Sequence, residues 1–292
     1  MTGLVFEPRV VDAGRGFGWW AEGFRIFRAS VGMWIGVFFV YLILTTLIGS
    51  IPFVGSIGHS LLTPVFIGGL MAGCRALERG EPLRMSHLFE GFQGAHFVPL
   101  MIIGALNIAL VVGLMVLAGA GLFGTARLQD LGSMSDPLRA FEAPLAAMGG
   151  GIGLLVMLLV VVAVAVFAML NWFAPALVVL RGVPAFQAMK LSFVASLRNW
   201  LPFLVYSLVV LIAGIALLLA VVGVAFALGA GALVSGNVAS GVGAFIGFFI
   251  ALVVAGLLFA LVVGPIAIGS VYAGFKDTLD DDDATVTNPA YR

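Results

Sequence analysis

The sequence predicts an all-α fold, a polytopic bundle of six transmembrane helices with three amphipathic helices at the cytoplasmic membrane interface. Three observations predict it. The composition is 62% hydrophobic and only 10% charged, whereas a soluble globular protein is about 25% charged. Six apolar stretches reach the roughly 20 residues that a helix needs to cross the hydrocarbon core. The lysines and arginines gather in alternate loops, as they do in membrane proteins with a fixed orientation.

The composition also limits what the protein does. The 39 glycines fit closely packed membrane helices. A formal net charge of zero argues against nucleic acid as a partner. Cys74 is the only cysteine, which excludes an intramolecular disulfide and a cysteine-based metal cluster. We expect no cleavable signal peptide, because the first thirty residues hold four arginines and no separate short apolar core.

The first expected element is an amphipathic helix that leads into the first span. Its large apolar residues recur every three or four positions, which places them on one face of a helix. Such a helix lies in the membrane interface, with its aromatic side chains toward the acyl chains and its arginines toward the headgroups. The predicted apolar face comprises Phe17, Trp20, Phe24, Phe27 and Val31.

The six predicted spans are followed by a short polar tail. The spans cover residues of about 31–51, 53–74, 97–123, 151–180, 200–228 and 242–275. Residues 1–13 are expected to be an N-terminal cytoplasmic tail, and residues 14–276 a single membrane domain. Residues 277–292 are expected to be an acidic, disordered cytoplasmic tail, because they are polar and include four consecutive aspartates.

The placement of basic residues predicts the orientation. Twelve of the fourteen lysines and arginines lie before the first span or in the loops and tail on that same side. Only Arg127 and Arg139 lie on the other side. Because cytoplasmic loops are enriched in basic residues, we expect both termini in the cytoplasm of a bacterial cell and the spans in its inner membrane.

The chain shows a faint threefold similarity. Aromatic or basic lead-ins precede the odd-numbered spans, and Glu90-Gly-Phe92 in the second echoes Glu22-Gly-Phe24 in the first. The even-numbered spans share a proline near their cytoplasmic ends. A divergent internal triplication with units of about 14–81, 82–183 and 184–279 is one interpretation. The alternative is that any span entering from the cytoplasm acquires such a lead-in.

Basic residues at the span ends are the first candidates for a binding role. Charge is absent from the middle of every span, which argues against an ion-coupled transporter built on intramembrane carboxylates. Arginines at headgroup depth attract anionic lipids, although topology signalling alone explains them. The candidates for lipid-headgroup contact are Arg25, Arg28, Arg75, Arg79, Arg181 and Arg198.

The prolines of the even-numbered spans are the second set of candidates. A proline removes a hydrogen bond within a membrane helix and can kink or interrupt it. Asn171 precedes Pro175 by four residues, so its side chain can reach the freed carbonyl. Such breaks would line a cavity for a solute or lipid, and the alternative is that the helices bend only to pack. The candidate residues are Pro64, Asn171, Pro175 and Pro265.

No catalytic, cofactor-binding or metal-ligating residue is predicted. A nucleotide-binding loop, an HExxH pair and a GxSxG elbow are all missing from the sequence. His59 has no second histidine, cysteine or carboxylate at ligand spacing, so we interpret it as an interhelical or interfacial hydrogen-bonding group. Its only conceivable catalytic partners are the acids of residues 136–142.

Three motifs carry a family resemblance. They are Gly18-Trp-Trp-Ala-Glu-Gly-Phe24 with Phe27-Arg28, then Ala72-Gly-Cys-Arg-Ala-Leu-Glu-Arg-Gly-Glu-Pro82, and Phe173-Ala-Pro175 with Arg198-Asn-Trp200. The chain resembles an uncharacterised family of proteobacterial six-span inner-membrane proteins. More distantly, it is similar to the membrane domain that precedes some bacterial glycerophosphodiester phosphodiesterases. The resemblance implies an inner-membrane location and an all-helical fold, and it carries over no catalytic residue.

The sequence leaves three functions to weigh. The first is a non-enzymatic, membrane-organising or accessory subunit whose partners are the bilayer, its anionic headgroups, and another membrane protein or a second copy of the chain. The second is a transporter or channel for a small or amphipathic solute, with a cavity near the three prolines. The third is a lipid-modifying enzyme, which would need clustered acids and histidines at the interface. We favour the first.

Overall fold

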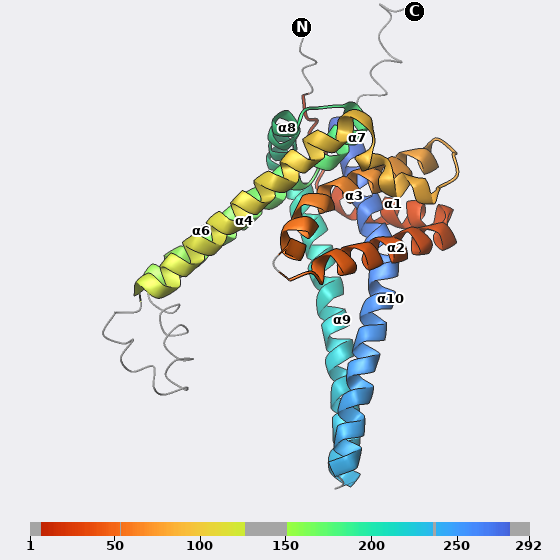
Figure 1. Ribbon diagram of the computed structural model, residues 1–292, viewed down its shortest axis with the longest axis vertical. Helices are drawn as coiled ribbons and strands as arrows, with labels where there is room; N and C mark the ends of the chain where they lie inside the picture. The colour runs from red at the N-terminus through yellow and green to blue at the C-terminus, as the bar shows by residue number, and fades with distance from the viewer. Residues whose placement is uncertain (1–6, 53, 126–150, 236–237, 281–292) are drawn as a thin grey trace, which may run out of the picture. The chain divides into compact units, whose positions relative to one another are not determined.

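The computed structural model describes residues 7–52, 54–125, 151–235 and 238–280 (Figure 1). Within these ranges it contains nine α-helices, two 3₁₀ helices and no strand. The α-helices are α1 (Arg15–Ala29), α2 (Val31–Gly49), α3 (Val54–Glu78), α4 (Phe97–Thr125), α6 (Gly151–Asn171), α7 (Ala174–Arg181), α8 (Ala185–Arg198), α9 (Trp200–Ser235) and α10 (Val238–Leu279). The 3₁₀ helices are η1 (Met85–Phe92) and η2 (Gly94–His96).

Six helical segments are long and apolar enough to cross a membrane, which confirms the predicted number of spans. They correspond to α2, α3, α4, α6 with α7, α9 and α10. Large apolar side chains on these segments are exposed on the protein itself, for example Ile212 at 67% and Leu219 at 65%. Such surface requires lipid around it, so contact with the bilayer follows from the fold.

The chain divides into two compact units. The first contains Met1–Thr46, Gly69–Glu90 and Val194–Arg292. The second contains Leu47–Gly68 and Gly91–Phe193. The expectation that residues 14–276 form a single membrane domain stays a prediction.

In the first unit, α1 packs against α9 and α10. The contact uses glycines, because a β-carbon at Gly16 would overlap the Pro202 carbonyl and one at Gly23 would overlap the Ile266 carbonyl. Trp19 lies on the same side of α1 and is 1% exposed. Close approach through small residues is the usual way in which membrane helices pack.

The packed side of α1 differs from the predicted apolar face. Phe17 and Phe24 are exposed, at 63% and 47%, as expected of residues that face lipid. Phe27 is buried, and Trp20 stacks on Tyr206 with ring centroids 5.3 Å apart. The helix therefore presents two apolar faces, one to the protein and one outward, and hydrophobic periodicity alone identified mainly the outward one.

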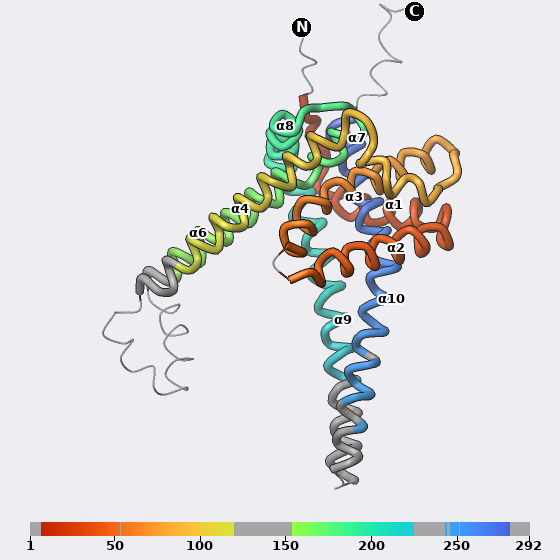
Figure 2. Tube along the Cα trace, in the orientation of Figure 1, coloured from red at the N-terminus to blue at the C-terminus, as the bar shows by residue number. Residues whose placement is uncertain are grey.

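The long helices α9 and α10 run side by side as a hairpin (Figures 1 and 2). With 36 and 42 residues, they are roughly 54 and 63 Å long at about 1.5 Å per residue. A bilayer core is only about 30 Å thick, so these helices must tilt or extend beyond it. Helix α10 also runs to Leu279, so the boundary predicted for the disordered tail at residue 277 falls inside a helix.

In the second unit, α4 lies beside α6, and the expected continuous span of residues 151–180 is broken (Figure 1). Helix α6 ends at Asn171, and Pro175 lies in the first turn of α7. Proline is tolerated at that position because its missing N–H would be unpaired in any case. The break lies where the Asn171–Pro175 motif predicted a helix disruption.

The break is closed by a serine from α8. The Phe173 N–H donates to the Ser192 hydroxyl at 2.9 Å, and that hydroxyl donates to the Met169 carbonyl at 2.6 Å. In an uninterrupted helix the Phe173 N–H would bond to the Met169 carbonyl directly. Ser192 is therefore inserted into the hydrogen-bond ladder, a recognised cause of a sharp bend. The Asn171 side chain bonds to the Phe167 carbonyl at 2.9 Å.

The three lead-ins take different forms. The first and third are the α-helices α1 and α8, whereas the second consists of the 3₁₀ helices η1 and η2. Each lead-in precedes two long helical segments, which is the order that a triplicated unit would have. The internal repeat itself stays a prediction.

Candidate functional site

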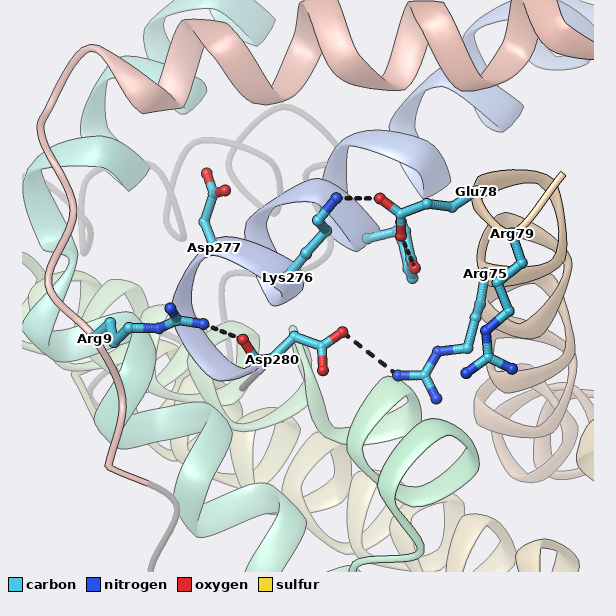
Figure 3. Close-up of a pocket in the computed structure, with 8 residues that line it drawn as sticks. Arg9, Arg75, Glu78, Arg79, Lys276, Asp277 and Asp280 are labelled. Carbon is cyan, nitrogen blue, oxygen red and sulfur yellow. Dashed lines mark hydrogen bonds and ion pairs between the residues drawn. The ribbon is translucent and has the colours of Figure 1, made fainter. Parts of the chain in front are cut away.

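A charged cavity of about 360 Å³ lies in the first unit, where the ends of α3 and α10 meet the N-terminal segment (Figure 3). These helix ends are the ends of predicted spans, so the cavity belongs to the boundary between lipid and water. It is lined by Arg9, Arg75, Glu78, Arg79, Tyr272, Lys276, Asp277 and Asp280.

The end of α3 positions three of these side chains. Gly80 has a φ of 76°, its N–H donates to the Leu77 carbonyl at 3.1 Å, and the Glu81 N–H donates to the Ala76 carbonyl at 2.9 Å. This is a Schellman motif, in which a left-handed glycine lets the backbone satisfy the last helical carbonyls. Arg75, Glu78 and Arg79 are spaced by three and four residues just before it, so they share one face.

Glu78 and Asp280 anchor the two ion-pair bridges of the cavity (Figure 3). The Glu78 carboxylate accepts hydrogen bonds from the Lys276 ammonium and the Tyr272 hydroxyl. The Asp280 carboxylate pairs with Arg75 at 3.5 Å, and the Asp280 carbonyl accepts from the Arg9 guanidinium. Asp280 is only 8% exposed, so burial without these cations would be costly.

Asp277 is turned toward α1. Its carboxylate accepts hydrogen bonds from Arg15 at 2.8 and 2.9 Å, and a third from the Trp19 indole at 2.8 Å. A bidentate arginine pair fixes orientation as well as charge. A second cavity of about 100 Å³ adjoins this cluster, lined by Arg15, Glu22, Glu78, Tyr272, Ala273, Lys276 and Asp277.

The N-terminal segment before α1 is hydrogen-bonded to residues at and beside the charged cavity. The Arg9 N–H donates to the Thr278 carbonyl at 2.9 Å, and the Asn199 side chain donates to the Arg9 carbonyl at 2.9 Å. The Val11 N–H donates back to the Asn199 side chain at 2.9 Å. Asn199 is fully buried. Residues 8–11, which belong to the expected cytoplasmic tail, join the start of α9 to the end of α10.

The structure brings together two of the six predicted headgroup arginines. Arg75 and Arg79 line the cavity, but Arg75 is bound to Asp280. Arg79 is exposed, and its guanidinium makes no hydrogen bond or ion pair with any residue that the structure describes. Figure 3 shows it beside Arg75 without an interaction drawn to the other residues.

The other four predicted arginines lie elsewhere. Arg25 bonds to Glu22 one turn away, which lowers the pKa of the Glu22 carboxyl and raises that of the guanidinium. Arg28 lies over the Phe24 ring, 5.8 Å from its centroid, on the exposed face of α1. Arg198 donates to the Pro8 carbonyl at 3.3 Å, and Arg181 ends α7 in the second unit.

The predicted proline set does not form one site within a single unit. Pro64 and Pro175 belong to the second unit and Pro265 to the first. All three are buried. The two cavities described above are lined by other residues, so the predicted cavity near the prolines stays a prediction.

The charged cavity contains cations and carboxylates that pair with one another. Each of its three carboxylates is engaged by a cation, which leaves no carboxylate placed as a general base. Among the described residues, no group of three or more His, Cys, Asp or Glu could hold a metal ion. His59 is exposed in the second unit, and the acids of residues 136–142 lie outside the described ranges.

The sequence did not predict this cluster of charged residues, because its members lie far apart in the chain. Arg9 and Asp280 are separated by 271 residues, and Arg75 and Asp280 by 205. Only the loop motifs that contain Arg75, Glu78, Arg79 and Asn199 marked the region in advance.

Six apolar spans and a charged cluster at the span ends define a multi-pass membrane protein of the all-helical class. The chain is 29% identical over 209 residues to a probable inner membrane protein of Burkholderia thailandensis, a match that covers 68% of this chain and 73% of that protein. No protein-family model matches the chain. No solved structure matches it either.

The relative supports the coarser part of the predicted resemblance, an inner-membrane protein. The more distant similarity to the membrane domain of glycerophosphodiester phosphodiesterases stays a prediction.

Proposed function

We propose that the protein is a non-enzymatic organising or accessory protein of the inner membrane, and that it binds phospholipid headgroups with the exposed face of α1. This proposal rests on the packing of α1 against α9 and α10 and on the residues that α1 leaves exposed. Glycine contacts fix the helix on α9 and α10, while Phe17, Phe24 and Arg28 stay exposed. A fixed amphipathic helix at the span ends presents aromatics where acyl chains meet headgroups.

The pairing within the charged cavity supports a structural role over catalysis. The bridges join the N-terminal segment to α3 and α10, which stabilises the unit at the level of the headgroups. The surplus length of α9 and α10 supports the accessory role, since apolar helix beyond the bilayer core requires a covering partner or a tilt. A second copy of the chain or another membrane protein would supply that cover.

Lipid composition around the protein tests the proposal. We expect wild-type protein extracted in polymer nanodiscs to carry more anionic lipid than empty nanodiscs from the same membrane. Replacing Arg25 and Arg28 by Gln removes two attractions of about 1 kcal/mol each and should reduce the enrichment several-fold. Lipid mass spectrometry measures it.

A matched variant that replaces Arg84 and Lys190 by Gln removes two exposed charges that belong to other segments than α1. It should reduce the enrichment less than the α1 variant does. Equal enrichment in all three proteins would contradict the proposed role of α1.

A transporter for an amphipathic solute is the second candidate, favoured by the break between α6 and α7. Discontinuous helices form the substrate sites of many transporters, and this span is interrupted about two turns before its end at Arg181. Proteoliposomes loaded with an amphipathic dye test it. Protein-dependent efflux that changes with Pro175→Ala would favour transport over the accessory role.

A further inference from the structure

We propose that the charged cavity at the ends of α3 and α10 is a binding site for a phosphate-bearing anion, with Arg79 as its principal ligand. This inference rests on the proposed headgroup binding and extends it from the surface of α1 to a defined cavity. The shared chemistry is a phosphate monoanion, carried either by an anionic phospholipid or by a free phosphate compound.

The cavity carries an excess of positive charge. Four cations line the cavity, namely Arg9, Arg75, Arg79 and Lys276, against the three carboxylates of Glu78, Asp277 and Asp280. Asp277 is further neutralised by Arg15 from α1. Arg15 and the four lining cations together exceed the carboxylates by two charges, so an anion is the ligand that balances the site.

Arg79 lines the cavity, and its neighbouring carboxylates are bound to other residues. Glu78, beside it in the chain, is bound to Lys276 and Tyr272, and Asp280 is bound to Arg75. Arg79 thus has no carboxylate partner among the described residues, although it lines the cavity. A guanidinium presents its donors in a planar fork that matches phosphate oxygens.

Hydrogen bonds weaken the helix dipoles at the cavity. The cavity lies at the C-terminal ends of two helices, where the helix dipoles disfavour an anion. Several of the nearby carbonyls already have partners, because the Gly80 and Glu81 N–H groups bond to the Leu77 and Ala76 carbonyls of α3 and Arg9 bonds to the carbonyls of Thr278 and Asp280. These hydrogen bonds partly offset the negative ends of both helices before a ligand arrives.

The location favours an anion that reaches the membrane surface. The cavity volume of about 360 Å³ exceeds what one phosphate group needs and leaves space for part of a headgroup. Arg79 follows the last residue of a transmembrane helix. We therefore expect it at the depth in the membrane at which phospholipid phosphates lie.

Native mass spectrometry of the full chain in detergent, with phosphatidylglycerol or phosphatidylethanolamine added, tests the proposal. We expect wild type to retain phosphatidylglycerol and Arg79→Gln to bind it about tenfold more weakly, the usual loss for a hydrogen bond to a charged group. Arg79→Lys should lie between them, because it keeps the charge without the fork. Arg84→Gln is the matched control, since Arg84 is exposed in the same unit and does not line the cavity.

A calorimetric titration with inorganic phosphate separates the two sources of the anion. Binding of phosphatidylglycerol alone would identify a lipid site, and binding of inorganic phosphate that is lost in Arg79→Gln would identify a site for a soluble phosphate. Equal binding of both probes by wild type and Arg79→Gln, with unchanged thermal unfolding, overturns the proposal. The α1 variant of Arg25 and Arg28 fails or succeeds independently, so the two proposals can be told apart.

Discussion

Ser192 is the single residue on which the interrupted span depends most directly. It is fully buried and replaces one backbone hydrogen bond with two. Ser192→Ala leaves the buried Phe173 N–H and the half-buried Met169 carbonyl without this bridge. Because an unsatisfied buried group costs about 1–3 kcal/mol, we expect the variant to unfold at a lower temperature. Thermal unfolding in detergent, followed by circular dichroism, measures the change.

Ser86→Ala is the matched control for this prediction, since Ser86 is an exposed serine in η1. Its unfolding temperature should stay close to that of wild type. A Ser192→Ala protein as stable as the control would mean that the helix break needs no bridge.

The sequence predicts the place of this break but not its partner. Asn171 and Pro175 mark the disruption locally, through a lost donor and a polar neighbour. Ser192 follows Met169 by 23 residues on a different helix, and hydropathy assigns it only to a polar position. The same limit applies to Arg9 and Asp280, since a pattern along the chain contains no information on which distant side chains meet.

At the scale of helices, α1 contains the clearest difference between expectation and structure. Aromatic periodicity predicts an outward face that includes Phe17 and Phe24, and these residues are exposed. The opposite face is set by glycines, which have no side chain and add little to a hydrophobic pattern. Gly16 and Gly23 are seven residues apart, or two helical turns, so both contribute to one contact line.

Gly23→Ala tests whether close approach determines the position of α1. A β-carbon there would overlap the Ile266 backbone, which cannot move as a side chain tip can. We expect destabilisation of about 1–3 kcal/mol, typical of overpacking, although alanine favours helix formation. Gly18→Ala in the same helix meets only the Arg15 side chain, at 3.4 Å, and should be neutral or stabilising. Unfolding temperatures that fall equally in both variants would contradict this account.

At the scale of the whole molecule, the number of spans was predictable and the division into two units was not. Long apolar runs identify spans because a bilayer imposes a minimum length on each helix. The units are assembled from segments far apart in sequence, such as Gly69–Glu90 with Val194–Arg292. The contacts within these units involve glycines, serines and ion pairs, and a hydropathy pattern does not predict such contacts.

The orientation of the protein in the membrane can be tested directly. The N-terminal segment and the end of α10 lie together through Arg9 and Asp280, and the even number of spans likewise predicts that both ends of the described chain lie on one side of the membrane. Twelve of the fourteen lysines and arginines lie on the same predicted side as the two ends. The positive-inside rule then favours a cytoplasmic location for that side. Single cysteines test the side chemically, in a Cys74→Ala background that removes the one native thiol.

Gln187→Cys places a thiol at an exposed position of α8, and Ser50→Cys places one at the exposed turn between α2 and α3. These positions flank spans on opposite predicted sides. In intact cells whose outer membrane has been made permeable, a membrane-impermeant maleimide should label Ser50→Cys and leave Gln187→Cys unlabelled until the inner membrane is lysed. The reverse pattern would invert the orientation, and the headgroup contacts proposed for α1 and Arg79 would then belong to the outer leaflet, where the positive-inside rule does not place them.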